Sequence, residues 1–193
     1  MYLITWIGWF ISEKGWDRSY SSNPIISLIK YHREILNFHT NLTTDHSYEA
    51  SPWNWLLLGR PTSFFYQSPK GCSVENCAQE ILALGTPLIW WFGLIAIFIT
   101  LGYFIYRRDS IAGLVLLAFS SNYLPWLLFP ERTTFYFYAI SLLPFLILTI
   151  CYAIKVFLED EFHRQKRGQI LVSGLALVGL VFLYFLPIYL GIS

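Results

Sequence analysis

Charged side chains are scarce in this sequence. Asp, Glu, Lys and Arg together make up 13% of the 193 residues, whereas they approach about a quarter of a soluble globular domain. The formal net charge is only +1, which argues against the extended basic surface of a nucleic-acid-binding protein. The three cysteines show no metal-ligand spacing. The sequence also has no Gly-rich phosphate loop, no Ser nucleophile elbow and no HExxH motif, so the enzyme classes that these motifs mark are not indicated.

Apolar residues, in contrast, are abundant. Hydrophobic side chains account for 55% of the sequence and aromatic ones for 19%, including eight Trp and thirteen Tyr; such rings favour the boundary between membrane and water. Four apolar runs can cross a hydrocarbon core of roughly 30 Å, which needs about 20 helical residues. They are 88–105, 111–129, 135–154 and 170–190. We therefore predict an all-α membrane protein with a four-helix transmembrane domain over residues 86–193, kinked at Pro125, Pro144 and Pro187.

The distribution of basic residues predicts the orientation, because Lys and Arg near span ends are retained on the cytoplasmic side. The connections after the first and third spans, with the span ends beside them, hold Arg107, Arg108, Lys155, Arg164, Lys166 and Arg167. The connection after the second span holds only Arg132. We therefore expect a multi-pass protein of the cell membrane in which the connections after the first and third spans face the cytosol. Residues 12–85, the Arg132 connection and the C-terminus then lie outside the cytoplasm.

The N-terminal part of the chain is organised differently. Residues 1–11 are apolar but too short to span a membrane, so we expect the remnant of a preceding transmembrane helix. Residues 12–85 form an extracytoplasmic loop of a length that is usually functional. Within this loop Ser22 or Asn23 precedes Pro24 as a helix cap. Apolar residues then recur every three or four positions, which predicts an amphipathic helix over 24–39 that packs on the bundle or lies along the membrane surface.

Two arginines are candidates for binding an anionic substrate or a lipid phosphate. Arg132 stands at the outer end of a span, where a guanidinium can hold a phosphate with two hydrogen bonds; an interface anchor is the alternative. Arg60 lies in a Gly-Arg-Pro turn among aromatic residues that include Trp53 and Trp55. This group suits a sugar phosphate or a peptide, and it equally suits seating the loop on the membrane.

The cysteines divide by position. Cys72 and Cys77 lie in a turn rich in Gly, Ser and Asn, on the side of the membrane where disulfides persist. We predict that they form a loop-closing disulfide, with two free thiols as the alternative. Cys151 lies in the middle of a span, and we expect it to be a small core residue.

Three histidines, His32, His39 and His46, recur every seven residues. On a helix this spacing separates neighbours by about two turns, too far for one metal ion without further ligands. We therefore predict no metal site and interpret these side chains as packing and hydrogen-bonding groups.

Five stretches of the chain are distinctive in their order and spelling: GWF at 8–10, YHREILNFHTNLT at 31–43, SPWNWLLLGRPTSFFY at 51–66, ALGTPLIWW at 83–91 and YLPWLLFPERTTFYFYAISLLPF at 123–145. They resemble the C-terminal region of bacterial protein O-mannosyltransferases that use polyprenyl-phosphate mannose, and the spelling is closest to the actinobacterial branch. The resemblance extends over nearly the whole chain, in the same order and with fitting spacing.

This resemblance implies part of a GT-C type fold and transfer of mannose from a polyprenyl-phosphate carrier to Ser or Thr of secreted proteins. The family carries an acidic Asp-Glu pair in its first outward loop, and nothing in this sequence matches that loop. We therefore expect no catalytic residue and no cofactor in this chain, and no activity unless the missing N-terminal half is supplied, for example as a separate chain. Arg132 first and Arg60 second are the candidates for stabilising the departing phosphate.

Two other functions remain open from the sequence. The first is a non-enzymatic membrane subunit that binds lipid or scaffolds a complex. The second is a small transporter, which is less favoured because the spans contain no interior charge and no inverted repeat.

Overall fold

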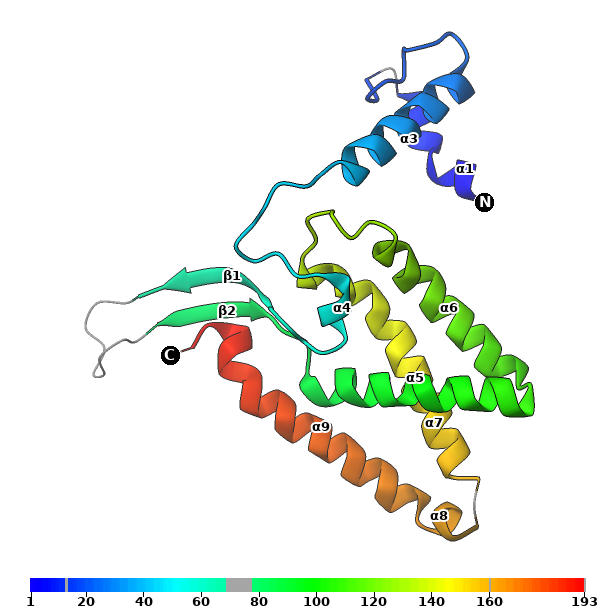
Figure 1. Cartoon of the computed structure of the whole chain (residues 1–193), viewed down its shortest axis with the longest axis vertical. Helices are drawn as coiled ribbons and strands as arrows, with labels where there is room; N and C mark the ends of the chain where they lie inside the picture. The colour runs from blue at the N-terminus through cyan, green and yellow to red at the C-terminus, as the bar shows by residue number, and fades with distance from the viewer. Residues whose placement is uncertain (13, 69–77, 160, 193) are drawn as a thin grey trace. The chain divides into compact units, whose positions relative to one another are not determined.

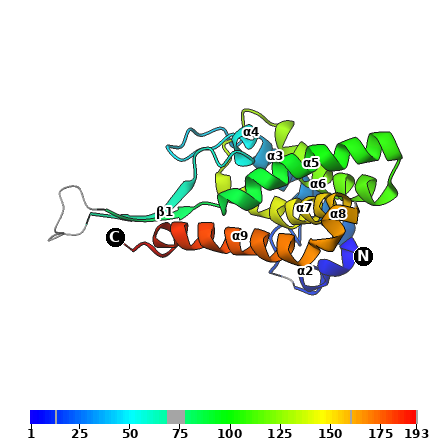
Figure 2. The same ribbon diagram turned by 90° about the horizontal axis from the view of Figure 1, so that it is seen from below.

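The computed structural model describes residues 1–12, 14–68, 78–159 and 161–192. These residues fall into two compact units, Met1–Thr44 and Asp45–Ser193. Figures 1 and 2 show the elements of both units in two views.

The first unit is built on a helix that begins where the sequence predicts. Its elements are α1 (Tyr2–Thr5), α2 (Ile7–Ile11) and α3 (Pro24–Thr40). Asn23 caps α3, because its side-chain oxygen accepts a hydrogen bond of 2.9 Å from the amide of Ile25, and Pro24 has the backbone angle that a first helical turn needs. Ser27 and Leu28 are buried, whereas Ile25 and most other apolar side chains of the helix are exposed. The predicted amphipathic helix therefore forms and buries only a narrow stripe.

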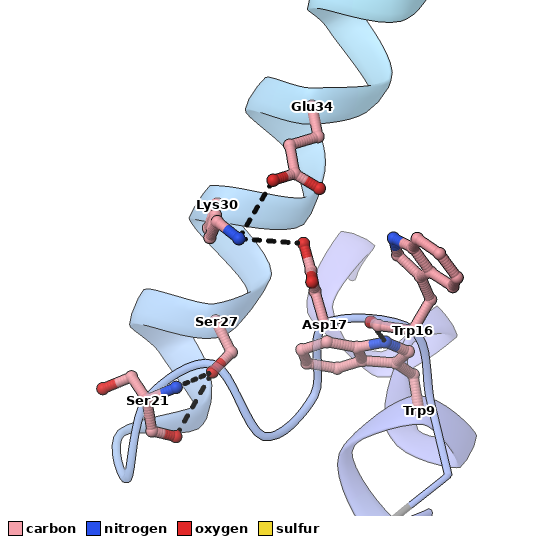
Figure 3. A network of polar contacts seen from close by, with 7 residues as sticks. All are labelled: Trp9, Trp16, Asp17, Ser21, Ser27, Lys30 and Glu34. Atoms are coloured by element: carbon pink, nitrogen blue, oxygen red, sulfur yellow. Dashed lines mark hydrogen bonds and ion pairs between the residues drawn. The ribbon is translucent and has the colours of Figure 1, made fainter.

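Polar contacts hold the segment between α2 and α3 against α3 (Figure 3). The ammonium of Lys30 lies 3.5 Å from the carboxylate of Asp17 and 3.0 Å from that of Glu34. The hydroxyl of Ser27, which is buried, accepts a hydrogen bond of 3.0 Å from the amide of Ser21. The hydrogen bond with Glu34 raises the pKa of Asp17, whereas the hydrogen bond with Lys30 lowers the pKa of Glu34. The two carboxyl groups thus share one lysine.

The second unit contains a β-hairpin and the membrane-spanning helices. Its elements are α4 (Pro52–Trp55), β1 (Thr62–Gln67), β2 (Gln79–Ala83), α5 (Pro87–Arg107), α6 (Ser110–Leu127), the 3-10 helix η1 (Tyr136–Leu142), α7 (Leu143–Phe157), α8 (Glu161–Gln165) and α9 (Arg167–Leu190). Within the described residues, four segments are long and apolar enough to cross a membrane: α5, α6, η1 with α7, and α9. The four predicted spans are confirmed, and their ends agree to within about three residues, the usual uncertainty of helix boundaries.

Helices α5 and α7 run in the same direction and form the centre of the bundle. The rings of Trp90 and Tyr136 lie 5.7 Å apart at the start of both segments, and those of Tyr103 and Tyr152 lie 6.3 Å apart near their ends. Gly93 allows the close approach, because a β-carbon there would lie 2.9 Å from a methyl group of the buried Leu146. Small and large side chains of the two spans meet at this contact, and the core of the unit extends from it to α4 and α6 through Trp55, Phe119 and Tyr123.

The third span is a 3-10 helix for its first seven residues and an α-helix only from Leu143 onward. Pro144 lies in the first turn of α7, a position that proline tolerates because it needs no amide donor there. Pro144 thus lies inside the third span, Tyr136–Phe157, as predicted, at the junction of its 3-10 and α-helical parts. Pro125 and Pro187 do lie inside α6 and α9.

A two-stranded antiparallel sheet interrupts the region that the sequence predicts to be a loop. Strands β1 and β2 pair from Thr62 with Ala83 to Gln67 with Gln79, with a register shift between Ser63 and Phe65. The end of α9 packs against β2. There Gly191 adopts a left-handed conformation with φ of 65°, and a β-carbon at this position would lie 2.8 Å from Ile81.

Helix α9 lies at the edge of the bundle. None of its residues is buried, and it contacts α5, α8 and β2. Leu175, Leu180 and Leu183 are among its exposed apolar side chains. The surface of this span is thus left for lipid or for another protein segment.

Candidate functional site

The segment before the hairpin is fixed to the loop between α6 and η1. The amide of Ala50 donates to the carbonyl of Thr134 at 2.8 Å, and the hydroxyl of Thr134 donates back to the carbonyl of Ala50 at 2.8 Å. The hydroxyl of Tyr123 on α6 donates to the carbonyl of Pro52 at 3.1 Å. Since Ala50, Thr134 and Tyr123 are buried, these bonds define one position for α4 on the bundle. We call this end of the bundle, with the starts of α5 and η1 and the ends of α6 and α9, the Arg132 end.

Trp55 is a core residue of the Arg132 end. Its side chain is fully buried, and its indole nitrogen donates to the carbonyl of Ala50 at 3.0 Å. Its ring meets Trp126 edge-on at 5.3 Å and Tyr138 at 6.5 Å. Trp55 is therefore packed among these rings, and its part in binding a ligand stays a prediction.

Arg132 lies over an aromatic platform. Its guanidinium carbon is 5.1 Å from the ring centre of Trp126 and 5.7 Å from that of Tyr138. These two rings stack on each other at 5.2 Å with their planes 18° apart. Arg132 is partly buried. A guanidinium held on ring faces has its orientation restricted, and its planar set of N–H donors matches the oxygens of a phosphate. We call Trp55, Trp126, Arg132 and Tyr138 the arginine–aromatic cluster.

The other two predicted residues lie on the surface of the same docked segment. Arg60 is exposed, has a left-handed backbone with φ of 68°, and donates to the carbonyl of Ser47 at 2.6 Å. Trp53 is 65% exposed. It lies two residues before Trp55 on one helical turn, so the two indoles point in opposite directions. The structure thus brings Trp55 and Arg132 to the same pair of rings, whereas Arg60 is engaged with its own loop.

An apolar cavity of about 530 Å³ opens beside the cluster, between the hairpin, the start of α5, η1 and the end of α9. Its lining includes Phe64, Trp90, Tyr136, Phe137 and Tyr189. Tyr136 accepts a hydrogen bond of 3.3 Å from the amide of Gly85. The hydroxyl of Tyr189 is buried and has no hydrogen-bond partner among the described residues. Because Tyr136 and Phe137 line the cavity and Tyr138 belongs to the cluster, one short segment connects the two features. The sequence did not indicate this cavity, since one of its walls is the hairpin.

The remaining sequence-based candidates are placed as follows. Cys72 and Cys77 lie outside the described residues, so their disulfide stays a prediction. The expectation that Cys151 is a core residue was wrong, because Cys151 is exposed on α7. Helix periodicity could have shown this, since Tyr152, one residue later, takes the buried position.

The histidines take part in packing and hydrogen bonding. In the first unit, the Nδ1 atom of His32 lies 2.8 Å from the carbonyl oxygen of Leu28, and its other ring nitrogen meets the hydroxyl of Tyr2. In the second unit, His46 packs edge-on against Phe135 at 5.0 Å. Within the described part of the chain, no three His, Cys, Asp or Glu side chains are grouped in a way that could hold a metal ion.

Comparison with known proteins gives a consistent result. Residues 25–193 match the model of the C-terminal four-span membrane region of protein O-mannosyltransferase. The chain is 32% identical to a polyprenol-phosphate-mannose–protein mannosyltransferase of Corynebacterium glutamicum, over 99% of this chain and 41% of that protein. It is 28% identical to the protein of the same name from Mycobacterium tuberculosis, over 100% of this chain and again 41% of the relative. The chain thus spans about two fifths of the length of these relatives.

A solved structure shares the fold. The complex of the protein O-mannosyltransferases Pmt1 and Pmt2 from S. cerevisiae, bound to the sugar donor, superimposes with a TM-score of 0.65 at 22% identity, over 90% of this chain and 25% of that one. This likeness confirms the predicted fold class, a multi-pass all-α membrane protein with part of a GT-C type fold. The family model covers well over half of the chain, and the chain belongs to the protein O-mannosyltransferase family, of which it contains the C-terminal four-span region.

Proposed function

We propose that this chain forms the C-terminal membrane part of an enzyme that moves mannose from a polyprenyl-phosphate carrier to Ser or Thr hydroxyls of secreted proteins. The observation that carries this proposal is the match of residues 25–193 to the four-span region of the family. The relatives are named for polyprenol-phosphate mannose as donor and protein as acceptor. Because the chain corresponds to about two fifths of those relatives, mannosyl transfer also needs the part that lies outside the match, including the group that deprotonates the acceptor.

The orientation that we propose places the Arg132 end outside the cytoplasm. Arg107 ends α5, Lys155 lies in the last turn of α7 and Arg167 begins α9. Since α5 and α7 run in the same direction, these basic residues gather at the end of the bundle opposite Arg132. We call it the Arg107 end. Retention of basic residues on the cytoplasmic side then leaves residues 12–85, Arg132 and the C-terminus on the outer side.

Within this orientation, Arg132 holds the phosphate of the donor. Transfer of the sugar leaves negative charge on that phosphate, and a preorganised cation stabilises such charge without having to reorganise. The platform of Trp126 and Tyr138 fixes the guanidinium, and fully buried Trp55 supports the platform from behind. The adjoining apolar cavity, with Phe64 among its lining residues, receives part of the prenyl chain. Arg132 is therefore a phosphate ligand and takes no proton from the acceptor.

The test is a hybrid enzyme that joins this chain to the N-terminal part of the Corynebacterium glutamicum relative. Mannose transfer from a polyprenyl-phosphate donor to a Ser/Thr peptide is measured for the parent, Arg132→Ala, Arg132→Lys and Arg60→Ala. We expect Arg132→Ala to lower kcat by about 10²-fold, the usual effect of losing one charge-stabilising donor. Arg132→Lys retains the charge but loses the planar fork, so it should lie between alanine and the parent. Arg60→Ala should change kcat much less, since Arg60 donates to Ser47.

Three outcomes would contradict the proposal. Full activity of Arg132→Ala would remove Arg132 from the donor site. Turnover by the 193-residue chain alone would show that it contains its own base. A hybrid that binds the polyprenyl donor but transfers no sugar would favour instead a lipid-binding membrane subunit.

A further inference from the structure

A second groove lies at the Arg107 end, between α7, α8 and α9. It encloses about 500 Å³. Its apolar part includes Ile154, Leu158 and Leu171, and its charged part consists of Lys155, Glu159, Arg164 and Arg167. The groove is thus apolar toward the membrane spans and predominantly basic toward the aqueous side.

Among the residues that the structure describes, the positive charge of this groove is only partly neutralised. Arg164 forms two hydrogen bonds with Glu161, of 2.7 and 2.9 Å. Lys155 lies 4.0 Å from Glu159, the limit of an ion pair. Arg167 has neither a hydrogen bond nor an ion pair to any residue in the described part of the chain, and it is exposed. Among these described contacts, one of the three cations therefore has no partner, and a second is weakly held.

The start of α9 adds to this charge. The helix begins at Arg167 without a side-chain cap and without an acidic residue in its first turn. The uncapped amides and the helix dipole of a 24-residue helix favour an anion at that end. The helix terminus and the basic side chains thus attract the same kind of ligand.

We infer that this groove binds the phosphate headgroup of an anionic phospholipid in the cytosolic leaflet. Basic pockets between membrane spans on the cytoplasmic side are suited to such headgroups, because the lipid phosphate meets the cations while the acyl chains stay in the hydrocarbon. The exposed apolar side chains of Leu148 on α7, and of Val172 and Leu175 on α9, provide that surface. A free phosphate ion gains nothing from the apolar part of the groove, so the lipid is the occupant that fits both halves. The inference uses the proposed orientation and is independent of mannosyl transfer, which we assign to the opposite end.

The experiment compares two variants that remove the same charge from the same end. Lys155→Gln/Arg167→Gln changes the groove, whereas Arg107→Gln/Arg108→Gln removes two cations that do not line it. The purified full chain in detergent is titrated with phosphatidylglycerol or phosphatidylcholine, and bound lipid is measured by native mass spectrometry. Each basic residue near an anionic lipid surface contributes about 1 kcal/mol, so we expect the groove variant to lose affinity for phosphatidylglycerol about 30-fold. The control should stay within about threefold of the parent, since its cations lie outside the groove.

A second measurement remains valid if the charge variant folds poorly. Cys151 lines the groove, and replacing Cys72 and Cys77 by serine leaves it as the single thiol of the chain. Phosphatidylglycerol should slow modification of Cys151 by N-ethylmaleimide, whereas phosphatidylcholine and inorganic phosphate should not. Equal loss of affinity in both charge variants, equal binding of both lipids, or protection of Cys151 by inorganic phosphate would each overturn the inference.

Discussion

The carbonyl of Ala50 offers a sensitive test of how the Arg132 end is held together. It accepts two hydrogen bonds, one from the indole of Trp55 at 3.0 Å and one from the hydroxyl of Thr134 at 2.8 Å, and Ala50 itself is 1% exposed. Trp55→Phe removes the first bond and Thr134→Val removes the second. After either single substitution the carbonyl keeps one partner, and after both it has none.

The magnitudes follow from this arrangement. Thr134→Val should destabilise the protein by about 1 kcal/mol, the net contribution of one hydrogen bond. Trp55→Phe should cost about 2 kcal/mol, because the smaller ring also leaves unfilled space in the core. The double substitution leaves a buried carbonyl unsatisfied, which adds about 1 to 3 kcal/mol to the sum. The double variant should therefore lose about 4 to 6 kcal/mol, more than the two single variants together.

Reversible unfolding in mixed micelles, followed by far-UV circular dichroism, measures the four free energies of this cycle. A matched control pairs Trp55→Phe with Thr100→Val, because the hydroxyl of Thr100 is equally buried but bonds within α5, to the carbonyl of Ala96 at 2.7 Å. The control pair should be additive. If the pair of Trp55→Phe and Thr134→Val is also additive to within about 0.5 kcal/mol, the carbonyl of Ala50 does not couple the docked segment to the third span.

Two further predictions concern the packing of α5 against α7 and the start of α6 at the Arg107 end. Gly93→Ala should destabilise the protein by about 1 to 3 kcal/mol through overpacking, since the new methyl group would meet Leu146 at 2.9 Å. Gly102→Ala, on the same helix with nothing within 4 Å, should be neutral or stabilising in the same assay of unfolding in mixed micelles. Hydrogen bonds from the first amides of α6 lower the pKa of Asp109 below its ordinary value of 3.8. The ionised Asp109 carboxylate therefore stabilises the folded protein above pH 3.8, and this stabilisation is lost as the pH falls through the lowered pKa. Asp109→Ala should therefore lower the melting temperature at pH 7, and the deficit should shrink toward pH 3; a deficit that does not depend on pH would contradict this.

The sequence predicts the membrane helices well because hydropathy and the charged connections mark their ends independently of packing. It does not predict the 3-10 start of the third span, since Tyr136–Leu142 contains no charged residue, glycine or proline that would mark a change of helix type. It also does not predict the hairpin. The run of Phe64, Phe65 and Tyr66 lacks the alternation of a half-buried strand, and all three side chains are exposed in the structure.

For the candidate site, the sequence identifies residues but not their roles. Arg132 was singled out as an isolated cation, and its support by Trp126 and Tyr138 depends on two segments that meet only after folding. The spacing of Trp53 and Trp55 does contain usable information, because residues two apart on one helical turn face opposite ways. Which of the two is buried is decided by the docking of Ala50 on Thr134, which no local pattern indicates.

The unburied surface of α9 has a consequence for how this protein is assembled. A helix without buried residues owes its place in the bilayer to its own transfer free energy, since each central Leu, Ile, Val or Phe favours insertion by about 0.3 to 0.6 kcal/mol. It can therefore enter the bilayer without support from a neighbouring span. Helix α6, the least apolar of the four spans, has a smaller driving force of this kind and is retained by its contacts with α5 and α7. Membrane insertion of α6 should thus depend on its contacts with neighbouring spans, whereas insertion of α9 should not.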